Sequence, residues 1–462
     1  MPELPLSLVL EATGGRLIRG PAPDRFRGVS TDTRALTAGS LFAALRGERF
    51  DGHDFAAEAL RRGAGAALVA REVEGAGPLI LVEDTLAALG KLAAAHRAKM
   101  PAVVVAITGS TGKTTTKEMA AAILARGGAT AKTPGNYNNE IGVPLALLGL
   151  EADHRAAVVE LAMRGRGQIA YLADMARPRV GVITNIGVSH LELLGSKKAI
   201  AEVKAELLAA LPADGAAVLN ADDEFVDRLR AHSPARVVTF GRSKDADVRV
   251  EEATLDAAGR VRCRLRGWWG EQEVMLKAAG RHHALNAAAA AAAAMLAGGR
   301  PEWVEAGLTA FQAADMRGQL VAAPGGYTVI NDCYNAAPDS MRVALELLMD
   351  LPGRAKWAAL GDMRELGAMA AEWHREVGEL AGRLGLSGLV GVGEMGRLIA
   401  DGARAYLGGD RVVGVESNAA AAELLRERLG PGDVVLVKGS RLMQMEEIVS
   451  ALVAEREGGG DE

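Results

Sequence analysis

Cysteine and aromatic residues are scarce in this sequence of 462 residues. Only two cysteines are present, Cys263 and Cys333, which excludes a disulfide framework and any metal cluster held by several thiolates. Phe, Trp and Tyr together make up 4% of the chain, so its cores have to be built from Val, Leu, Ile and Ala. The most apolar long run, residues 287–297, consists mainly of alanine and is too short to span a bilayer.

The chain also lacks a strong net charge and a recognisable export signal. A formal net charge of −5 gives no overall attraction to nucleic acid or to anionic lipid. Residues 1–20 show no basic start followed by an apolar core, which is the pattern of a secretory signal. We therefore expect a soluble cytoplasmic protein with no nucleic-acid partner and no membrane insertion. We also expect it to work as a monomer.

The length predicts several domains, because one hydrophobic core rarely serves so long a chain. We expect an α/β protein with a small α/β domain over residues 1–99, which ends in a helix at 85–99 before Pro101. A central P-loop ATPase-like domain with a parallel sheet is expected over 100–312. A C-terminal Rossmann-like, doubly wound sheet is expected over 313–462.

The most informative stretch is residues 103–117, VVVAITGSTGKTTTK. It predicts a buried parallel strand, a Gly-rich loop and a helix, an arrangement whose backbone N–H groups hold a phosphate. Lys113 adds a positive charge, and the Thr114 hydroxyl can reach Mg²⁺. The two glycines lie closer together than in the usual P-loop, and a chance Gly-rich turn is the alternative. The predicted ATP-binding residues of the loop are Gly109, Ser110, Thr111, Gly112, Lys113, Thr114 and Thr115.

Two further apolar strands, predicted over 156–162 and 179–186, deliver polar groups near this loop. Glu160 lies inside the first strand and His190 follows the second. Because ligands of open parallel sheets lie beyond the carboxyl ends of the strands, both are candidates for a second metal site on the γ-phosphate. A carboxylate in a buried strand needs a cation or strong donors, which supports Glu160. For His190 alone, a structural histidine is the alternative.

The helix predicted over 197–211 places Lys204 inside its apolar stripe. A buried ammonium group is costly, and burial lowers the pKa of a lysine. A neutral lysine amine can take up CO₂ to form a carbamate, which turns a cation into a ligand for Mg²⁺. The alternative is that Lys204 extends from the edge of the stripe into solvent.

Other polar clusters have both a ligand-binding and a structural interpretation. One cluster of polar residues follows a short N-terminal strand and comprises Ser30, Thr31, Asp32, Arg34 and, after the next strand, Arg46. These side chains could bind a sugar nucleotide, or they form a capped turn with surface charges. Residues 132–144 are predicted to form no regular element and contain three asparagines, among them Asn136 and Asn139, which meet a ligand or belong to a surface loop. Asn286, near the start of an Ala-rich helix, is a helical polar residue or a contact to adenine.

The last third of the chain alternates between strands and helices, which predicts a doubly wound sheet. No G-x-G-x-x-G follows its first strand, and without this dinucleotide-binding motif the sequence gives little support to a nicotinamide-dependent enzyme. Polar clusters end three of the strands, at 331–335, 361–367 and 438–441, and we interpret them as one ligand site facing the central domain. Before this region, residues 248–274 predict an antiparallel strand pair added to the central sheet.

These motifs resemble those of the Mur ligases of bacterial cell-wall synthesis. The resemblance runs through STDTR, TGSTGKTTTKE, TPGNYNNEIGVPL, KAELL, DMRGQ, NDCYNAAPDSM, LGDMRELG and VLVKGSR. It implies ATP, two Mg²⁺ ions and a CO₂-derived carbamate as cofactors. It implies that Lys113 and Thr114 bind the ATP phosphates and Mg²⁺, and that Glu160, His190 and carbamylated Lys204 hold the second Mg²⁺. It implies that Asn286 contacts adenine, Arg317 the phosphates and Asp332 the ribose. It also implies that the uridine nucleotide is bound by Ser30, Asp32, Arg34 and Arg46, and that the dipeptide is bound by Asn335.

Within the family, YNAAPDSM together with LGDMRELG favours a particular reaction. The resemblance implies a ligase that joins D-alanyl-D-alanine to UDP-N-acetylmuramoyl-tripeptide through an acyl phosphate, at the expense of ATP. One alternative is a sibling ligase that adds a single amino acid to a shorter precursor. The other is a P-loop ATPase that works as a switch without ligation.

Overall fold

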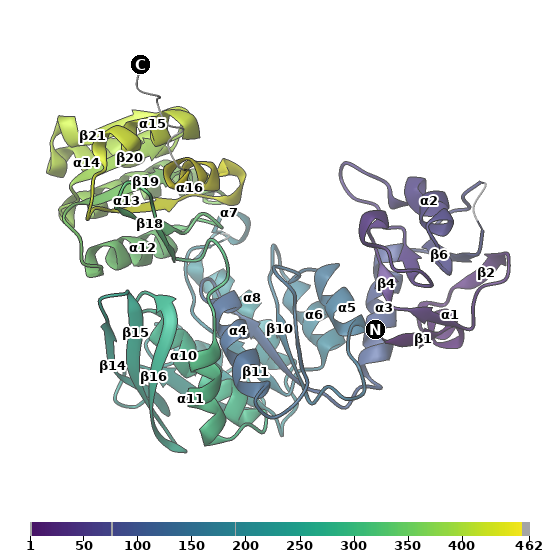
Figure 1. Cartoon of the computed structure of the whole chain (residues 1–462). Helices are drawn as coiled ribbons and strands as arrows, with labels where there is room; N and C mark the ends of the chain where they lie inside the picture. Colours follow the sequence, from purple (N-terminus) through teal and green to yellow (C-terminus); the bar gives the residue numbers. More distant parts are fainter. Residues whose placement is uncertain (1, 75–76, 190, 455–462) are drawn as a thin grey trace.

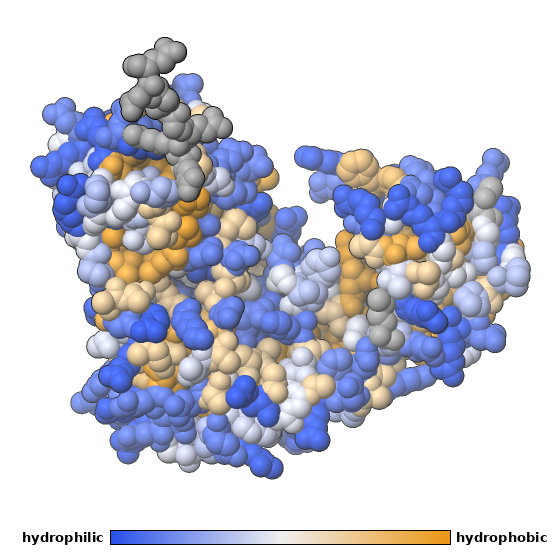
Figure 2. Space-filling model, in the orientation of Figure 1, coloured by the Kyte–Doolittle hydropathy of each residue, from blue (hydrophilic) through white to orange (hydrophobic). Residues whose placement is uncertain are grey.

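Three large sheets, of five, nine and six strands, follow one another along the chain (Figure 1). The computed structural model describes residues 2–74, 77–189 and 191–454. Two lobes, one N-terminal and one C-terminal, are joined to a central part, and the surface is deeply hollowed between the two lobes (Figure 2). Among the described residues, no helix combines the length and the apolar composition that crossing a bilayer requires.

The N-terminal part is built on a mixed five-stranded sheet in the order β2-β7-β6-β5-β4. Only β2 runs antiparallel to its neighbour. The strands are β2 (Arg16–Arg19), β4 (Val29–Ser30), β5 (Leu41–Ala43), β6 (Ala66–Val69) and β7 (Leu79–Leu81), with a separate pair β1 (Glu3–Pro5) and β3 (Arg25–Arg27). The helices are α1 (Leu6–Thr13), α2 (Ala56–Arg61) and α3 (Thr85–Arg97).

Helix α3 ties this part to the centre of the molecule. It begins where Asp84 accepts the Ala87 N–H at 2.7 Å, and it ends within two residues of the helix end predicted from the sequence. Leu89 and Leu92 of α3 are fully buried in an apolar cluster that extends from the N-terminal sheet into the central one. The N-terminal and central parts therefore share one continuous core.

The central sheet has nine strands in the order β16-β15-β14-β13-β12-β11-β8-β10-β9. From β9 to β14 the neighbours are parallel, and β14, β15 and β16 are antiparallel. The strands are β8 (Val103–Thr108), β9 (Thr130–Lys132), β10 (Ala156–Glu160), β11 (Val180–Ile183), β12 (Ala216–Asn220), β13 (Arg236–Gly241), β14 (Val248–Leu255), β15 (Arg260–Gly267) and β16 (Gly270–Ala279). The helices are α4 (Lys113–Leu124), α5 (Gly142–Leu148), α6 (Gln168–Ala176), α7 (Leu191–Leu194), α8 (Lys197–Ala209), α9 (Val226–Arg230), α10 (His283–Leu296) and α11 (Pro301–Ala310).

The apolar run that precedes the Gly-rich loop forms β8 because both of its faces are buried. Val104 and Ala106 pack into the core that continues to the N-terminal part, whereas Val105 and Ile107 pack against α4 and α10 on the other face. Central strands of parallel sheets therefore read as unbroken apolar segments.

Two expectations for the central part were wrong. Instead of the strand pair predicted over 248–274, the structure has three antiparallel strands, β14, β15 and β16, and the last of them continues to Ala279. The segment 132–144 was expected to form no regular element, but α5 begins inside it at Gly142. Pro144 lies in the first turn of α5, where a missing N–H breaks no intrahelical hydrogen bond.

The C-terminal sheet has six strands in the order β17-β18-β22-β19-β20-β21, with apolar clusters on both faces. All neighbours are parallel except β17, an edge strand that the sequence reasoning did not predict. The strands are β17 (Gln319–Ala322), β18 (Thr328–Asn331), β19 (Lys356–Gly361), β20 (Gly388–Val392), β21 (Val412–Val415) and β22 (Val434–Lys438). The helices are α12 (Pro338–Asp350), α13 (Ala370–Arg383), α14 (Gly396–Leu407), α15 (Asn418–Arg428) and α16 (Glu446–Val453).

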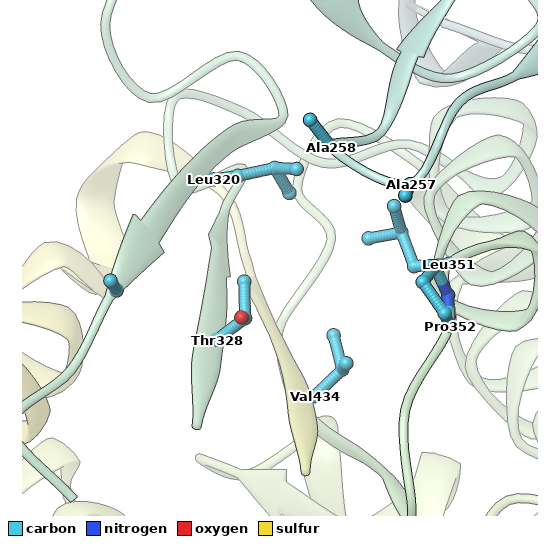
Figure 3. A pocket seen from close by; sticks show the side chains of 8 residues that line it. Ala257, Ala258, Leu320, Thr328, Leu351, Pro352 and Val434 are labelled. Atoms are coloured by element: carbon cyan, nitrogen blue, oxygen red, sulfur yellow. The ribbon is translucent and has the colours of Figure 1, made fainter. Parts of the chain in front are cut away.

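The amino ends of the C-terminal strands rest on the turn between β14 and β15. A Cβ on Gly259, whose φ is +75°, would lie 2.7 Å from Leu320 Cδ1 and 2.9 Å from Leu351 Cδ2. Beside this contact lies a cavity of about 260 Å³, lined by Ala257 and Ala258 of the turn and by C-terminal residues (Figure 3). This support leaves the opposite ends of the strands, the carboxyl ends, open to the central sheet.

Candidate active site

A cleft of about 1410 Å³ separates the central sheet from the C-terminal sheet. The carboxyl ends of β8, β10 and β11 face it from one side, and those of β18, β19 and β22 from the other. The structure brings most of the predicted site residues together on its walls: Ser110, Thr111, Gly112, Lys113, Thr114, Thr115, Asn136, Asn139, Glu160, Asn286, Arg317, Asp332 and Asn335.

The Gly-rich loop depends on both of its glycines. Gly109 has φ +148°, and a Cβ on it would lie 1.8 Å from Thr184 Oγ1. Gly112 has φ +78°, and a Cβ there would lie 2.5 Å from Asn286 Oδ1. The adenine candidate thus sits directly against the loop.

Lys113 folds back over the loop. Its Nζ donates to the carbonyl oxygens of Gly109 at 2.8 Å and Ser110 at 3.3 Å. Burial lowers the pKa of Lys113, the nearby Glu160 carboxylate opposes this shift, and Arg317 adds to it. The amine is therefore held at the loop by backbone carbonyls, which an anionic ligand can replace.

The sequence reasoning missed the residues that brace the loop from β11. Asn185 accepts the Thr111 N–H through Oδ1 at 3.0 Å and donates to Thr111 Oγ1 through Nδ2 at 2.7 Å. Thr184 Oγ1 donates to the Thr111 carbonyl at 2.5 Å. The available signal was the polar pair Thr-Asn at the carboxyl end of a strand that lies beside β8.

Glu160 is buried, with 2% of its surface exposed, and both of its carboxylate oxygens have donors. Thr114 Oγ1 donates to Oε2 at 2.8 Å, which joins two predicted Mg²⁺ ligands. Asn138 Nδ2 donates to Oε1 at 2.8 Å, although the sequence reasoning selected its neighbours Asn136 and Asn139. Asn139 instead accepts the Gly142 N–H at 2.9 Å at the start of α5. Its side chain therefore has a structural role in the loop, which is the alternative to ligand binding.

Lys204 lies on α8 with 2% of its surface exposed, so the alternative in which it extends into solvent is wrong. Its Nζ makes no hydrogen bond or ion pair with the described residues. Burial, and secondarily the nearby charge of Lys113, hold the pKa of Lys204 well below its ordinary value of 10.5. Burial therefore favours the neutral amine form of this side chain. His190, its predicted companion, lies outside the described residues.

The C-terminal wall carries a second positive group, Lys438, which belongs to the strand-end cluster 438–441 that we assigned to a ligand site. Lys438 Nζ donates to Asp332 Oδ2 at 2.6 Å and to the Asn335 carbonyl at 2.8 Å, which fixes the predicted ribose and dipeptide residues relative to each other. Arg317 stacks over Tyr334, with its guanidinium carbon 3.8 Å from the ring centre. Burial, together with nearby Lys438, lowers the pKa of His282 to about 4.

The cluster at 361–367 contributes only in part to the cleft. Arg364 and Glu365 line it. Asp362 does not act as a ligand-binding group, because its Oδ1 accepts the N–H groups of Met395 at 3.0 Å and Gly396 at 2.9 Å at the start of α14. Interpreting all three strand-end clusters as one ligand site was therefore wrong for Asp362.

The predicted sugar-nucleotide cluster lies on the N-terminal sheet, away from this cleft. Asp32 accepts the Arg34 backbone N–H at 2.9 Å and forms a bidentate ion pair with its guanidinium, which lowers the pKa of Asp32 to about 2. Ser30 Oγ donates to the Asp32 carbonyl at 2.9 Å. The capped-turn interpretation therefore describes Asp32 and Arg34 in this structure. Arg46 begins the neighbouring loop, where its backbone forms an isolated antiparallel β-bridge with that of Asp51.

The comparisons with known proteins cover all three parts of the chain. Models described as "Mur ligase family, catalytic domain", "Mur ligase middle domain" and "Mur ligase, glutamate ligase domain" match residues 25–97, 107–294 and 316–441. The chain belongs to the Mur ligase family. The resemblance identified from the sequence motifs is thereby confirmed.

Similar proteins extend over almost the whole length. A UDP-N-acetylmuramoyl-tripeptide–D-alanyl-D-alanine ligase of Synechocystis is 40% identical over 93% of either chain. A crystal structure of MurF from Acinetobacter baumannii is 32% identical, with a TM-score of 0.91 over 98% of this chain and 100% of that one. MurF ligase from Thermotoga maritima, in complex with ADP, is 30% identical, with a TM-score of 0.81 over 92% and 97%. The three-domain α/β fold expected from the sequence is confirmed by these structures.

Proposed function

We propose that this Mur ligase joins D-alanyl-D-alanine to the terminal carboxyl group of UDP-N-acetylmuramoyl-tripeptide, with ATP converted to ADP and phosphate. The relatives named for this reaction support it, because they match 93% and 98% of the chain at 40% identity. The observation that carries the proposal within the molecule is the cleft, where a phosphate-binding loop on one sheet faces polar strand ends of another. Such a cleft holds ATP and two further reactants together.

The chemistry follows from the poor reactivity of a carboxylate. Transfer of the γ-phosphoryl group to the tripeptide carboxylate gives an acyl phosphate, which the dipeptide amine attacks, and phosphate then leaves. No side-chain nucleophile is needed, so catalysis consists of positioning and electrostatic stabilisation. The loop N–H groups and Lys113 would bind the ATP phosphates, Arg317 would approach them from the segment between α11 and β17, and the two walls of the cleft would limit access of water.

The residues present fit a divalent cation. Thr114 and Glu160 place a hydroxyl and a buried carboxylate 2.8 Å apart beside the loop, both of them oxygen ligands of the kind Mg²⁺ prefers. No three His, Cys, Asp or Glu side chains gather into a metal site within the described ranges, so further ligands are required. Lys204 meets this need as a carbamate, together with His190. When bound, Mg²⁺ offsets the negative charge on the transferring phosphoryl group.

The remaining assignments complete the proposal. Residues 1–99 would bind the uridine nucleotide through Ser30, Thr31, Asp32, Arg34 and Arg46, residues 100–312 would bind ATP, and residues 313–462 would bring the dipeptide near Asn335. Asn286 and Asp332 would contact adenine and ribose, with Asn136 near the tripeptide. ATP and UDP-linked precursors are cytoplasmic compounds, which supports a cytoplasmic location. We also propose that the chain works as a monomer.

The decisive experiment measures phosphate release from ATP with the purified full chain. Release is expected only when UDP-N-acetylmuramoyl-tripeptide and D-alanyl-D-alanine are both present. Single amino acids with the shorter dipeptide precursor form the control for a sibling ligase, and ATP alone is the control for a switch ATPase. Turnover that needs no acceptor, or that prefers a single amino acid, would replace the proposed reaction by one of these.

A further inference from the structure

The C-terminal domain reaches the phosphate-binding loop through a short chain of hydrogen bonds. The backbone N–H groups of residues 186–188, which follow β11, donate in order to Asp223 Oδ2 at 2.7 Å, Ser110 Oγ at 2.8 Å and Asp339 Oδ2 at 3.1 Å. Ser110 belongs to the loop, and Asp339 belongs to α12 of the C-terminal domain. Three neighbouring amides therefore link the central sheet, the loop and the other side of the cleft.

The contact between the two domains is close at Gly187. A Cβ at this position would lie 2.2 Å from Asp339 Oδ2 and 3.2 Å from Ser110 Cβ. Gly187 is not among the glycines with positive φ, so it supplies space here and not an unusual conformation. Asp339 itself lies in the first turn of α12, where the helix dipole favours a carboxylate.

The opposite end of α12 provides a natural comparison. Asp350, the last residue of the helix, forms an ion pair with Arg281 at 3.0 Å, with 27% and 51% of the two side chains exposed. The helix has 13 residues and is therefore about 20 Å long. Both ends contact the central domain, but the Asp339 end meets the phosphate-binding loop and the Asp350 end meets the segment before α10. Exposed ion pairs of the second kind contribute little.

We propose that Asp339 is a positioning residue of the ligase. With the C-terminal domain docked as in this structure, its carboxylate holds the backbone at residue 188, and through Gly187 it holds Ser110 and the phosphate-binding loop. The site that receives the ATP phosphates is thus complete only when the domain that brings the amine is in place. The kinetic part of this inference rests on the proposed function.

Removing the carboxylate leaves the Val188 N–H, on a buried residue, without its acceptor. Residues 186–188 then lose one of three anchors, and the loop loses its connection to α12. Because displacement of reacting groups by about 1 Å costs on the order of 100-fold in rate, we expect Asp339→Ala to lower kcat about 10- to 100-fold. The KM for the UDP-linked precursor should stay within about twofold, because that substrate is bound mainly by the distant N-terminal domain.

The test compares Asp339→Ala, Asp339→Asn and Asp350→Ala in the full chain. Asparagine keeps an oxygen that can accept the Val188 N–H, so Asp339→Asn should recover most of kcat. Asp350→Ala breaks the contact at the other end of the same helix and should change kcat by less than about threefold. Equal losses in Asp339→Ala and Asp350→Ala, or full kcat in Asp339→Ala, would overturn the proposal.

Amide hydrogen exchange supplies a readout that does not depend on turnover. In Asp339→Ala, exchange at residue 188 should become faster, while residues 342–350 of α12 and the thermal midpoint stay as in the unaltered protein. ADP should also protect residues 109–115 less in this variant. Unchanged exchange at residue 188 would refute the role even if kcat falls.

A variant on the other side of the contact guards against misfolding. Gly187→Ala places a methyl group where Asp339 and Ser110 now approach, and it should reproduce the kcat loss and weaker ADP protection. If Asp339→Ala does not fold, Gly187→Ala decides the question, and normal kcat in a folded Gly187→Ala protein would reject the proposal. If the unaltered protein releases no phosphate with any acceptor, the proposed function fails, whereas exchange and ADP protection still test Asp339.

Discussion

Replacing Lys204 with Met should make the protein more stable and nearly inactive. The folded protein holds this amine with 2% of its surface exposed and with its pKa well below 10.5, whereas the unfolded chain exposes an ordinary ammonium. Because the pKa is lowered in the folded state, the unfolded chain binds the proton of this amine more tightly, and this difference lowers the free energy of unfolding at pH 7 to 8. Met has a similar length and no amine. We expect a gain of about 1–3 kcal/mol, the usual cost of an unsatisfied buried polar group.

The expected effect on activity has the opposite sign. If Lys204 carries a carbamate that helps hold Mg²⁺, its loss removes several kcal/mol of charge stabilisation, which is about a thousandfold or more in kcat. Unfolding in urea, in CO₂-depleted and metal-free buffer, measures the first effect, and phosphate release measures the second. Lys204→Ala should regain part of its activity with short carboxylic acids, because the smaller side chain leaves room for a free carboxylate.

A matched control lies on the same helix. Lys197 is 41% exposed and pairs with Glu224, so Lys197→Met makes the same chemical change on the solvent side of α8. This variant should change stability by less than about 0.5 kcal/mol and leave turnover unaltered. If Lys204 had only a structural role, Lys204→Met would lower stability and would not affect turnover of the folded protein. A Lys204→Met protein that is less stable, and whose activity falls only with its folded fraction, would refute the reasoning.

Three further predictions concern the rest of the cleft. Lys113→Ala should abolish turnover and preserve calorimetric binding of the UDP-linked precursor; loss of both would reject the domain assignment. Asn138→Ala removes a donor to the Glu160 carboxylate and should lower kcat at least about tenfold, whereas Asn139→Ala should mainly lower stability in urea, by about 1 kcal/mol. His282 stays neutral down to a pKa of about 4 while the unfolded chain takes up a proton below 6.5. Stability should therefore fall between pH 6.5 and 4 by up to about 3 kcal/mol, and less in His282→Asn.

The elements predicted best from the sequence are those whose burial produces a recognisable apolar pattern along the chain. β8 is apolar on both faces, so its run of residues identifies a central strand without further information. The phase of α8 likewise put Lys204 among Ile200, Val203 and Leu207, which are all fully buried. What periodicity could not supply is the absence of a partner for Lys204 within the described structure, because partners come from other elements.

The errors fall where the geometry of a loop decides between neighbours. Asn138 and Asn139 have the same side chain, yet one donates to Glu160 and the other accepts at the start of α5. Asp332 and Asp362 each come directly after a parallel strand, but only Asp362 accepts N–H groups at the start of α14. Such choices depend on the backbone path over two or three residues, on which residue type gives no information.

The buried lysines show where this fold requires something from outside the chain. Three lysines are buried among the described residues: Lys117, Lys204 and Lys438. Lys117 donates to the carbonyls of residues 133 and 135 at 2.8 and 3.0 Å, and Lys438 pairs with Asp332. Both amines are therefore satisfied by hydrogen bonds within the protein itself. Lys204 has no such partner in the described structure, and a cation left unpaired in the interior is among the most costly arrangements a fold can hold. Burial and the nearby charge of Lys113 favour its neutral form, and we propose that CO₂ converts this amine into a carbamate ligand.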